Sequence, residues 1–266
     1  MTFAQKYGPW AVIAGASQGI GRAMAHHVAS RGIHCVLAAR REGPLVELAD
    51  EIRARHGVEC RTVSVDLSAR DCLDRVNDAI GELEIGLVVN NAGADTIGTR
   101  FLESEVERWI GLADLNVASS MSFAHHFGRI MKARGRGGIL IVGSGACYGG
   151  SKYTSVYSGA KAFQQCFAEG LWAELRPYSV DVLYCALGAT DTPAFREFLG
   201  RRDLDMFPGA ADPAVVAEKV LARLSDGPVY NWGFEDDESG FLPMSASARR
   251  QRVLVVDEGS KQIYGD

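Results

Sequence analysis

The sequence predicts a single α/β domain in which one doubly wound parallel sheet carries helices on both faces. Short apolar runs typical of buried strands alternate with segments of helical periodicity along the chain. The first apolar run leads directly into a glycine-rich turn, and no linker, repeat or low-complexity segment interrupts the alternation. We therefore expect residues 1–266 to form one domain.

Composition and charge narrow the class of protein. Hydrophobic residues make up 47% and charged residues 23% of the 266 residues, which is ordinary for a globular protein. The net charge of −5 argues against a surface that binds nucleic acid or an anionic membrane. No apolar run approaches the length of a transmembrane helix and no signal peptide is recognisable, so we expect a cytoplasmic protein.

The cysteines and histidines do not indicate a metal site. The six cysteines show no C-x-x-C pair, and several lie inside apolar runs, as small buried thiols do in a reducing compartment. Two adjacent histidine pairs occur, at 26–27 and 125–126, but neighbours on a helix point away from each other. We predict no metal ligands.

The first predicted unit is a strand, a glycine-rich turn and a helix. The apolar run 10–14 precedes the turn, after which Ala23, Met24 and Val28 recur at helical spacing as far as Gly32. Glycines let the backbone approach a pyrophosphate, which then lies on the N–H groups of the helix start. This context predicts a dinucleotide-binding turn, Gly15-Ala16-Ser17-Gln18-Gly19-Ile20-Gly21.

The end of the second predicted strand, residues 35–39, bears on the choice of cofactor. Arg40 lies 19 residues beyond Gly21, where NAD-binding chains carry a carboxylate for the ribose hydroxyls. Here Arg40 and Arg41 occupy the region, and Glu42 stands too late to take the carboxylate role. A guanidinium group matches a 2′-phosphate, so we expect NADP(H) rather than NAD(H). The alternative is a pair of solvated loop arginines.

The following segments continue the alternation. Asp66-Leu67-Ser68 is a turn that also offers a helix N-cap, and the pattern between 103 and 134 indicates two helices, the second starting near Asn116. Strands are expected at 60–65, 85–89, 138–143, 180–187 and 228–232, and further helices at 45–57, 73–83, 157–175, from Asp212-Pro213 onward and at 245–264.

Polar side chains gather where the predicted strands end, which is the edge at which open α/β sheets bind ligands. Asn116 and the pair Tyr157–Lys161 lie at the starts of neighbouring helices. Tyr157 and Lys161 are four residues apart and share a helix face, and an ammonium group beside a phenol favours the phenolate. Such a pair can also arise by chance on a solvated helix. The polar residues at strand ends are those of the glycine turn, Arg40, Asp66, Asn91, Ser144 and the loop from Gly188.

Together these motifs resemble those of the short-chain dehydrogenase/reductase family over essentially the whole chain. Ser144 precedes Tyr157 by 13 residues, the usual interval in that family. The resemblance rests on Gly15-Ala16-Ser17-Gln18-Gly19-Ile20-Gly21, Asp66-Leu67, Asn90-Asn91-Ala92-Gly93, Asn116, Ser144 and Tyr157-Ser158-Gly159-Ala160-Lys161.

The resemblance implies a role for each of four catalytic residues. Tyr157 would protonate a carbonyl oxygen during reduction or take the proton during oxidation, and Lys161 would lower the pKa of Tyr157 and bind the nicotinamide ribose. Ser144 would hold the carbonyl oxygen. Asn116 would anchor a water that relays protons through Lys161.

The resemblance also implies the residues around the cofactor. Asp66 would meet the adenine amine and Leu67 the ring edge, while Thr190 and Thr192 would flank the nicotinamide. The full expected set is Gly15, Ser17, Gln18, Gly19, Ile20, Gly21, Arg40, Arg41, Asp66, Leu67, Asn91, Ala92, Gly93, Tyr157, Lys161, Gly188, Thr190 and Thr192.

The chain departs from the family pattern at a few positions. Ala14 replaces a threonine, and Leu187 replaces the proline before Gly188, which leaves that loop more mobile. Gln18 stands where many NADP-preferring members carry a second basic residue, so Arg40 would carry most of the preference. Gly143 and Gly159 are expected to be neutral changes.

These features lead to an NADP(H)-dependent carbonyl reductase or alcohol dehydrogenase that acts on a small-molecule substrate. The apolar segment 193–211, with Tyr148 and Tyr153, suggests a lid over a sizeable apolar ketone (steroid-like, aryl or fatty β-keto); alternatively its phenylalanines pack a surface helix onto the sheet. A non-catalytic NADP(H)-binding redox sensor is the second hypothesis, and isomerisation or dehydration is a minor third.

The resemblance also implies an assembly. We expect a homodimer or homotetramer in which the helices at 116–134 and 157–176 pair between subunits. Residues 233–266 are expected to form a C-terminal extension.

Overall fold

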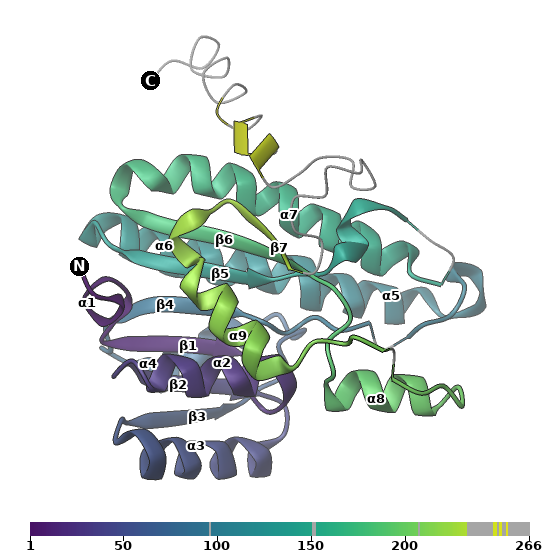
Figure 1. Ribbon diagram of the computed structural model, residues 1–266, viewed down its shortest axis with the longest axis horizontal. Helices are drawn as coiled ribbons and strands as arrows, with labels where there is room; N and C mark the ends of the chain where they lie inside the picture. The colour runs from purple at the N-terminus through teal and green to yellow at the C-terminus, as the bar shows by residue number, and fades with distance from the viewer. Residues whose placement is uncertain are drawn as a thin grey trace.

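A seven-stranded parallel sheet forms the centre of the computed structural model, with strand order β3-β2-β1-β4-β5-β6-β7 and helices on both faces (Figure 1). The structure describes residues 1–95, 97–150, 153–206 and 208–232, and positions 247, 248, 250, 251 and 254. The predicted doubly wound α/β fold is confirmed. The strands are β1 (Trp10–Ala14), β2 (His34–Ala39), β3 (Cys60–Ser64), β4 (Ile85–Asn90), β5 (Gly137–Val142), β6 (Val180–Leu187) and β7 (Val229–Trp232).

The helices form two layers that cover the sheet. The core beneath one layer contains α2, α3 and α9, and the core beneath the other contains α4, α6 and α7. The helices are α1 (Phe3–Tyr7), α2 (Gly19–Ala29), α3 (Glu42–His56), α4 (Cys72–Ile80), α5 (Val106–Ala113), α6 (Ser119–Arg134), α7 (Ser155–Leu175), α8 (Pro193–Gly200) and α9 (Pro213–Ala222).

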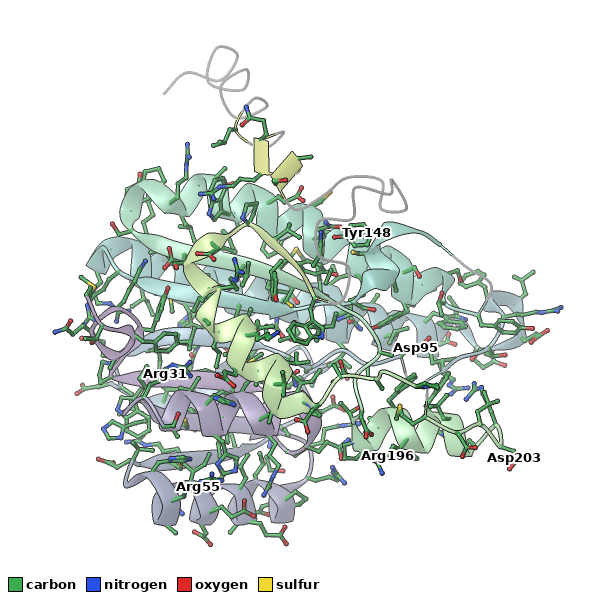
Figure 2. The ribbon with its side chains drawn as sticks, in the orientation of Figure 1. Arg31, Arg55, Asp95, Tyr148, Arg196 and Asp203 are labelled. Atoms are coloured by element: carbon green, nitrogen blue, oxygen red, sulfur yellow. The ribbon has the colours of Figure 1, made fainter. Side chains whose placement is uncertain are left out.

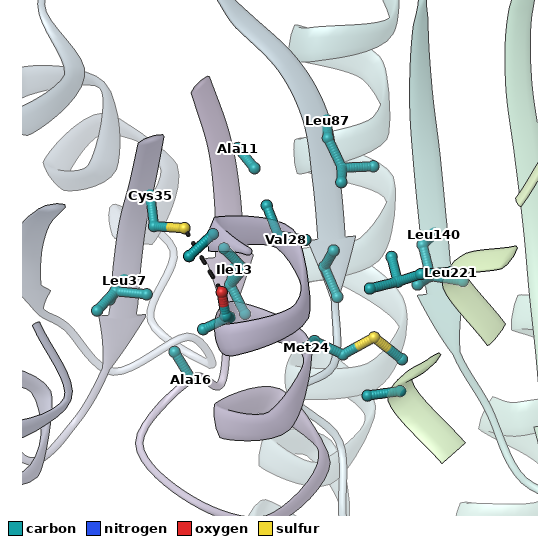
Figure 3. Packing of buried hydrophobic residues seen from close by; sticks show 14 of the residues in the cluster. Ala11, Ile13, Ala16, Met24, Val28, Cys35, Leu37, Leu87, Leu140 and Leu221 are labelled. Carbon is teal, nitrogen blue, oxygen red and sulfur yellow. Dashed lines mark hydrogen bonds between the residues drawn. The ribbon is translucent and has the colours of Figure 1, made fainter. Parts of the chain in front are cut away.

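Successive residues of each strand enter opposite cores. In β1, Ala11 and Ile13 pack under α2, whereas Val12 faces the other layer. Met24 and Val28 of α2 pack in the same core as Ala11 and Ile13 (Figure 3). Strands buried on both faces read as continuous apolar runs, which is why β1 and β6 have the bounds expected from the sequence.

The long helical region between 106 and 134 differs from the expectation. A π-helical turn, Asp114–Ala118, joins α5 directly to α6, and the flanking Ala113 and Ser119 keep right-handed helical backbone. Asn116 therefore lies inside one continuous helical run, and the prediction that a second helix starts there was wrong. No proline or glycine marks such a turn, because it only adds a residue to the hydrogen-bonded loop.

Of the two N-caps predicted at Asp212 and at residues 66–68, only the one at Asp212 is present. Asp212 caps α9 as predicted, since its side chain accepts a hydrogen bond of 2.6 Å from the backbone N–H of Ala214. The segment 66–68 does not cap α4, whose N-cap is Asp71. Asp66 instead accepts hydrogen bonds from the N–H and hydroxyl of Ser68 at 2.9 and 2.7 Å, which closes a local turn.

The last part of the chain is described only at the five positions named above. The predicted helix at 245–264 and the extension 233–266 otherwise lie outside the described residues. Within the described part of the chain, no helix is both long and apolar enough to span a membrane.

Candidate active site

Tight backbone packing shapes the turn between β1 and α2. Gly15 and Gly19 have positive φ angles of +83° and +56°, and a Cβ atom on Gly21 would lie 2.1 Å from the carbonyl oxygen of Gly15. That same oxygen accepts a hydrogen bond of 2.9 Å from the side chain of Asn91, which joins the turn to the end of β4. The first N–H groups of α2 follow this turn directly and have no partner within the helix. Because such groups bind anions, the residues present fit a pyrophosphate.

The side of the glycine turn that faces the end of β2 is basic. Arg40 and Arg41 are both exposed at the end of β2, and the guanidinium of Arg41 donates a hydrogen bond of 2.6 Å to the side-chain oxygen of Gln18. Hydrogen bonds from Ser68 lower the pKa of Asp66, with a smaller contribution from the charge of Arg40. Asp66 is therefore an ionised acceptor at neutral pH, and the buried Leu67 lies next to it.

The loop after β6 closes the other side of the glycine turn. A Cβ atom on Gly19 would lie 3.0 Å from the methyl group of Thr192. Thr192 caps α8 by accepting a hydrogen bond of 3.2 Å from the N–H of Phe195. The buried Thr190 donates a hydrogen bond of 3.2 Å from its hydroxyl to the carbonyl of Gly188. Helix α8 therefore starts against the glycine turn.

Ser144 follows β5, and its backbone is held in place by the side chain of Tyr184. The hydroxyl oxygen of Tyr184, a buried residue of β6, accepts a hydrogen bond of 3.1 Å from the N–H of Ser144 and donates one of 3.2 Å to its carbonyl. The aromatic ring lies against Gly143, where a Cβ atom would be 2.0 Å from the Tyr184 Cζ. Gly143, which we expected to be a neutral change, is thus required by Tyr184.

Tyr157 and Lys161 project from the first turns of α7 toward the end of β5, where the Tyr157 side chain meets Ser144 and the Lys161 Nζ meets the carbonyl of Val142. The Lys161 Nζ lies 5.6 Å from the centre of the Tyr157 ring and is buried. Burial is the main cause that raises the pKa of Tyr157; a hydrogen bond with the Ser144 side chain opposes it, and Asp95 and Cys147 add to it. Burial also lowers the pKa of Lys161 to about 7, which Cys147 partly opposes.

Asn116, in the π turn, meets Lys161 at Gly93, which follows β4. A Cβ atom on Gly93 would lie 2.4 Å from the Asn116 Oδ1 and 3.0 Å from the Lys161 Nζ, so both atoms face the backbone of Gly93. The Asn116 Oδ1 is buried and has no hydrogen-bond partner among the described residues. A buried acceptor and an ammonium group that meet at one edge fit the hydroxyl groups of a ribose.

A network of buried polar side chains lies behind Lys161. The Lys161 Nζ donates to the carbonyl of Val142 at 3.3 Å and to the Gln164 Oε1 at 3.0 Å. The Gln164 Nε2 donates to the carbonyl of Asn116 and to the hydroxyl of Ser120, both at 2.7 Å. No sequence motif indicated Gln164, Ser120 or Tyr184; the one available signal was a pair of glutamines, 164 and 165, on a largely apolar helix.

A cavity of about 360 Å³ lies between the loop after β4 and α8. Arg202 crosses it by donating hydrogen bonds to the carbonyls of Gly98 at 2.8 Å and Phe198 at 3.0 Å. Figure 2 shows Asp95, Tyr148 and Arg196 around the same end of the molecule. The cavity is lined by Ile97, Phe198, Arg201 and Arg202, whereas Phe207 of the expected lid lies outside the described residues.

The chain is similar to proteins of known activity. It is 30% identical over 253 residues to a 7beta-hydroxysteroid dehydrogenase of Clostridium sardiniense, which covers 95% of this chain and 91% of that protein. It is 36% identical to a very-long-chain 3-oxoacyl-CoA reductase of Scheffersomyces stipitis, over 68% of this chain and 55% of that one. A short-chain dehydrogenase from Sphingobium yanoikuyae in complex with NADPH has a similar structure, with a TM-score of 0.77, 27% identity and coverage of 96% of both chains.

The model of the short chain dehydrogenase family matches residues 9–202, which include the glycine turn, Ser144, Tyr157 and Lys161. The relatives named above are dehydrogenases and reductases, so both the expected resemblance and the expected enzyme class are confirmed. The chain belongs to the short-chain dehydrogenase family of oxidoreductases.

Proposed function

We propose that this protein is an NADP(H)-dependent oxidoreductase that interconverts a carbonyl and a secondary alcohol, with Tyr157 as the acid or base. The observation that carries the proposal is the meeting of three groups at one sheet edge. The Tyr157 hydroxyl is hydrogen-bonded with Ser144, and the buried Lys161 ammonium lies 5.6 Å from the Tyr157 ring.

The chemistry of these residues suits carbonyl reduction. NADPH supplies the hydride when it is bound. As negative charge develops on the carbonyl oxygen, the hydroxyls of Ser144 and Tyr157 donate hydrogen bonds to it, and Tyr157 transfers its proton. The raised pKa of Tyr157 keeps it protonated beforehand, and the charge of Lys161 stabilises the phenolate that remains. Asn116, held in the π turn, faces the same edge.

The two arginines at the end of β2 support NADP(H) over NAD(H) as the cofactor. Arg40 and Arg41 offer guanidinium groups where a carboxylate would favour NAD(H), and Gln18 is already bonded to Arg41. The similar Sphingobium protein was solved with NADPH. We infer that Arg40, which makes no side-chain hydrogen bond in the described part of the chain, meets the 2′-phosphate.

The substrate that we propose is a sizeable apolar ketone. The cavity between the loop after β4 and α8 is lined by Ile97 and Phe198 together with Arg201 and Arg202, and the names of two similar proteins refer to a hydroxysteroid and a very-long-chain 3-oxoacyl-CoA. Residues 193–211 would act as the lid over this cavity within a single domain of residues 1–266. We further propose that the enzyme is a homo-oligomer.

A panel of ketones tests this function. Steroid-like, aryl and fatty β-keto compounds are mixed with the protein and either NADPH or NADH, and the absorbance of the reduced nicotinamide is followed. We expect turnover of at least one bulky ketone, with kcat/KM about 10- to 100-fold higher for NADPH because a charge-assisted contact is lost with NADH. Arg40→Gln should reduce that preference, and equal use of NADH would contradict our interpretation of Arg40.

A further inference from the structure

We propose that Gln164 is a positioning residue for the Lys161 ammonium group, which it holds by a fixed acceptor inside the protein. This inference rests on the proposed function, in which the charge of Lys161 supports Tyr157. Gln164 lies one helical turn after Lys161 on α7 and is completely buried, at 0% exposure.

The orientation of the Gln164 amide follows from its partners. The carbonyl oxygen of Asn116 can only accept a hydrogen bond, so the group facing it at 2.7 Å must be the amide nitrogen of Gln164. The amide oxygen then faces the Lys161 Nζ, 3.0 Å away. The side chain thus presents an acceptor, and not a donor, to the ammonium group.

Two further elements hold the amide in place. The hydroxyl of Ser120, on α6, accepts hydrogen bonds from Gln164 at 2.7 Å and from the side chain of Asn90, at the end of β4, at 2.9 Å. It donates its own proton to the carbonyl of Asn116 at 2.6 Å. The single donor and both acceptor positions of this hydroxyl are used, so the network fixes Gln164 from α6, the π turn and β4 together.

Lys161 needs such an acceptor because it is buried without an ion-pair partner in the described part of the chain. Its two acceptors are neutral, and the Gln164 oxygen at 3.0 Å is nearer than the Val142 carbonyl at 3.3 Å. The titratable groups that face it are Tyr157 on its own helix, whose ring centre lies 5.6 Å away, and Cys147 after β5. Asp95 after β4 and Tyr184 on β6 interact with Tyr157. A hydrogen bond to a buried charge favours the charged form.

The network also connects Lys161 to Asn116. The resemblance assigns to Asn116 a water that relays protons through Lys161, and the amide of Gln164 additionally links the backbone carbonyl of Asn116 to Lys161. The Asn116 carbonyl accepts hydrogen bonds from two side chains, Ser120 and Gln164. An amide keeps its protons, so Gln164 orients Lys161 and does not itself carry protons to it.

The test compares Gln164→Met with Gln165→Met. Both glutamines are buried on α7, at 0% and 2% exposure, but the Gln165 amide nitrogen has no hydrogen-bond partner among the described residues, so Gln165→Met is a matched control. Loss of the acceptor in Gln164→Met should weaken proton binding by Lys161 about 10- to 100-fold. The limb of the pH–rate profile that reports Lys161 should therefore move to lower pH by about one to two units.

A second variant and a second measurement make the outcome decisive. Gln164→Glu keeps an acceptor and adds a negative charge, so its profile should move to higher pH, opposite to Gln164→Met. The pH dependence of unfolding, measured without cofactor or substrate, reports the Lys161 pKa even if no ketone is turned over, which separates this inference from the proposed function. The proposal is overturned if both Gln164 variants titrate like the wild type and Gln165→Met.

Discussion

At the scale of single residues, the site depends on contacts between residues far apart in the sequence. The spacing of Ser144, Tyr157 and Lys161 could be read from the sequence because these residues follow a strand and a helix of recognisable pattern. Tyr184 could not, because its hydroxyl meets Ser144 across 40 residues of chain. Within an apolar strand, a tyrosine indicates only that the position is buried.

The pair Gly143 and Tyr184 gives a first prediction. A methyl group in Gly143→Ala would overlap the Tyr184 ring, so we expect a loss of about 1–3 kcal/mol in the free energy of unfolding and lower activity through Ser144. Gly159→Ala is the control, since nothing lies within 4 Å of its added methyl group and α7 gains helix propensity. Denaturant unfolding measures both, and equal stability of the two variants would refute the required role of Gly143.

The buried charge of Lys161 gives a prediction on pH. Its pKa is about 7 in the folded protein and 10.5 when unperturbed, so between these values the unfolded chain binds a proton that the folded protein lacks. The free energy of unfolding that Lys161 contributes should therefore rise with pH from about 7 to 10.5 and stay flat below 7. Subtracting the curve for Lys161→Met from the wild-type curve isolates this contribution. A flat difference would mean that Lys161 titrates normally.

At the scale of secondary-structure elements, strands and amphipathic helices were predictable and the π turn was not. The strands are buried on both faces and bounded by glycine or polar residues, so their apolar runs stand out. The π turn at 114–118 adds a residue to one turn and so shifts the apolar pattern of the helix, and the sequence therefore suggested two separate helices. The turn matters because it carries Asn116 into the network behind Lys161.

The faces of α5, α6 and α7 that point to solvent carry apolar side chains, which leads to a prediction on assembly. Ile110, Met121 and Phe163 are 54%, 41% and 36% exposed, an arrangement that suits contact with a second copy. Phe163→Glu should shift the wild-type oligomer toward monomer in sedimentation experiments, whereas Val46→Glu, at an exposed position on α3, should not. A wild-type protein that sediments as a monomer at micromolar concentration would contradict the proposed homo-oligomer.

At the scale of the whole molecule, the parallel sheet collects its functional groups at one edge. The glycine turn follows β1, Asn91 follows β4, Ser144 follows β5 and Gly188 follows β6, so the carboxyl ends of four strands meet around one site. This convergence could be predicted, because it follows from the connectivity of parallel strands. The side-chain network of Gln164, Ser120 and Asn90 could not, because it depends on how α6 and α7 pack against β4.

The most direct test of the central claim is the turnover of Tyr157→Phe, measured together with its affinity for NADPH. Removing one hydroxyl group takes away the proposed acid and leaves the ring in place, so we expect kcat to fall by about 10²–10⁴-fold with little change in NADPH binding. A protein that only senses NADP(H) would show no such loss, because it would have no turnover to lose. Unchanged turnover in Tyr157→Phe would contradict the role of Tyr157 as the acid and base of this enzyme.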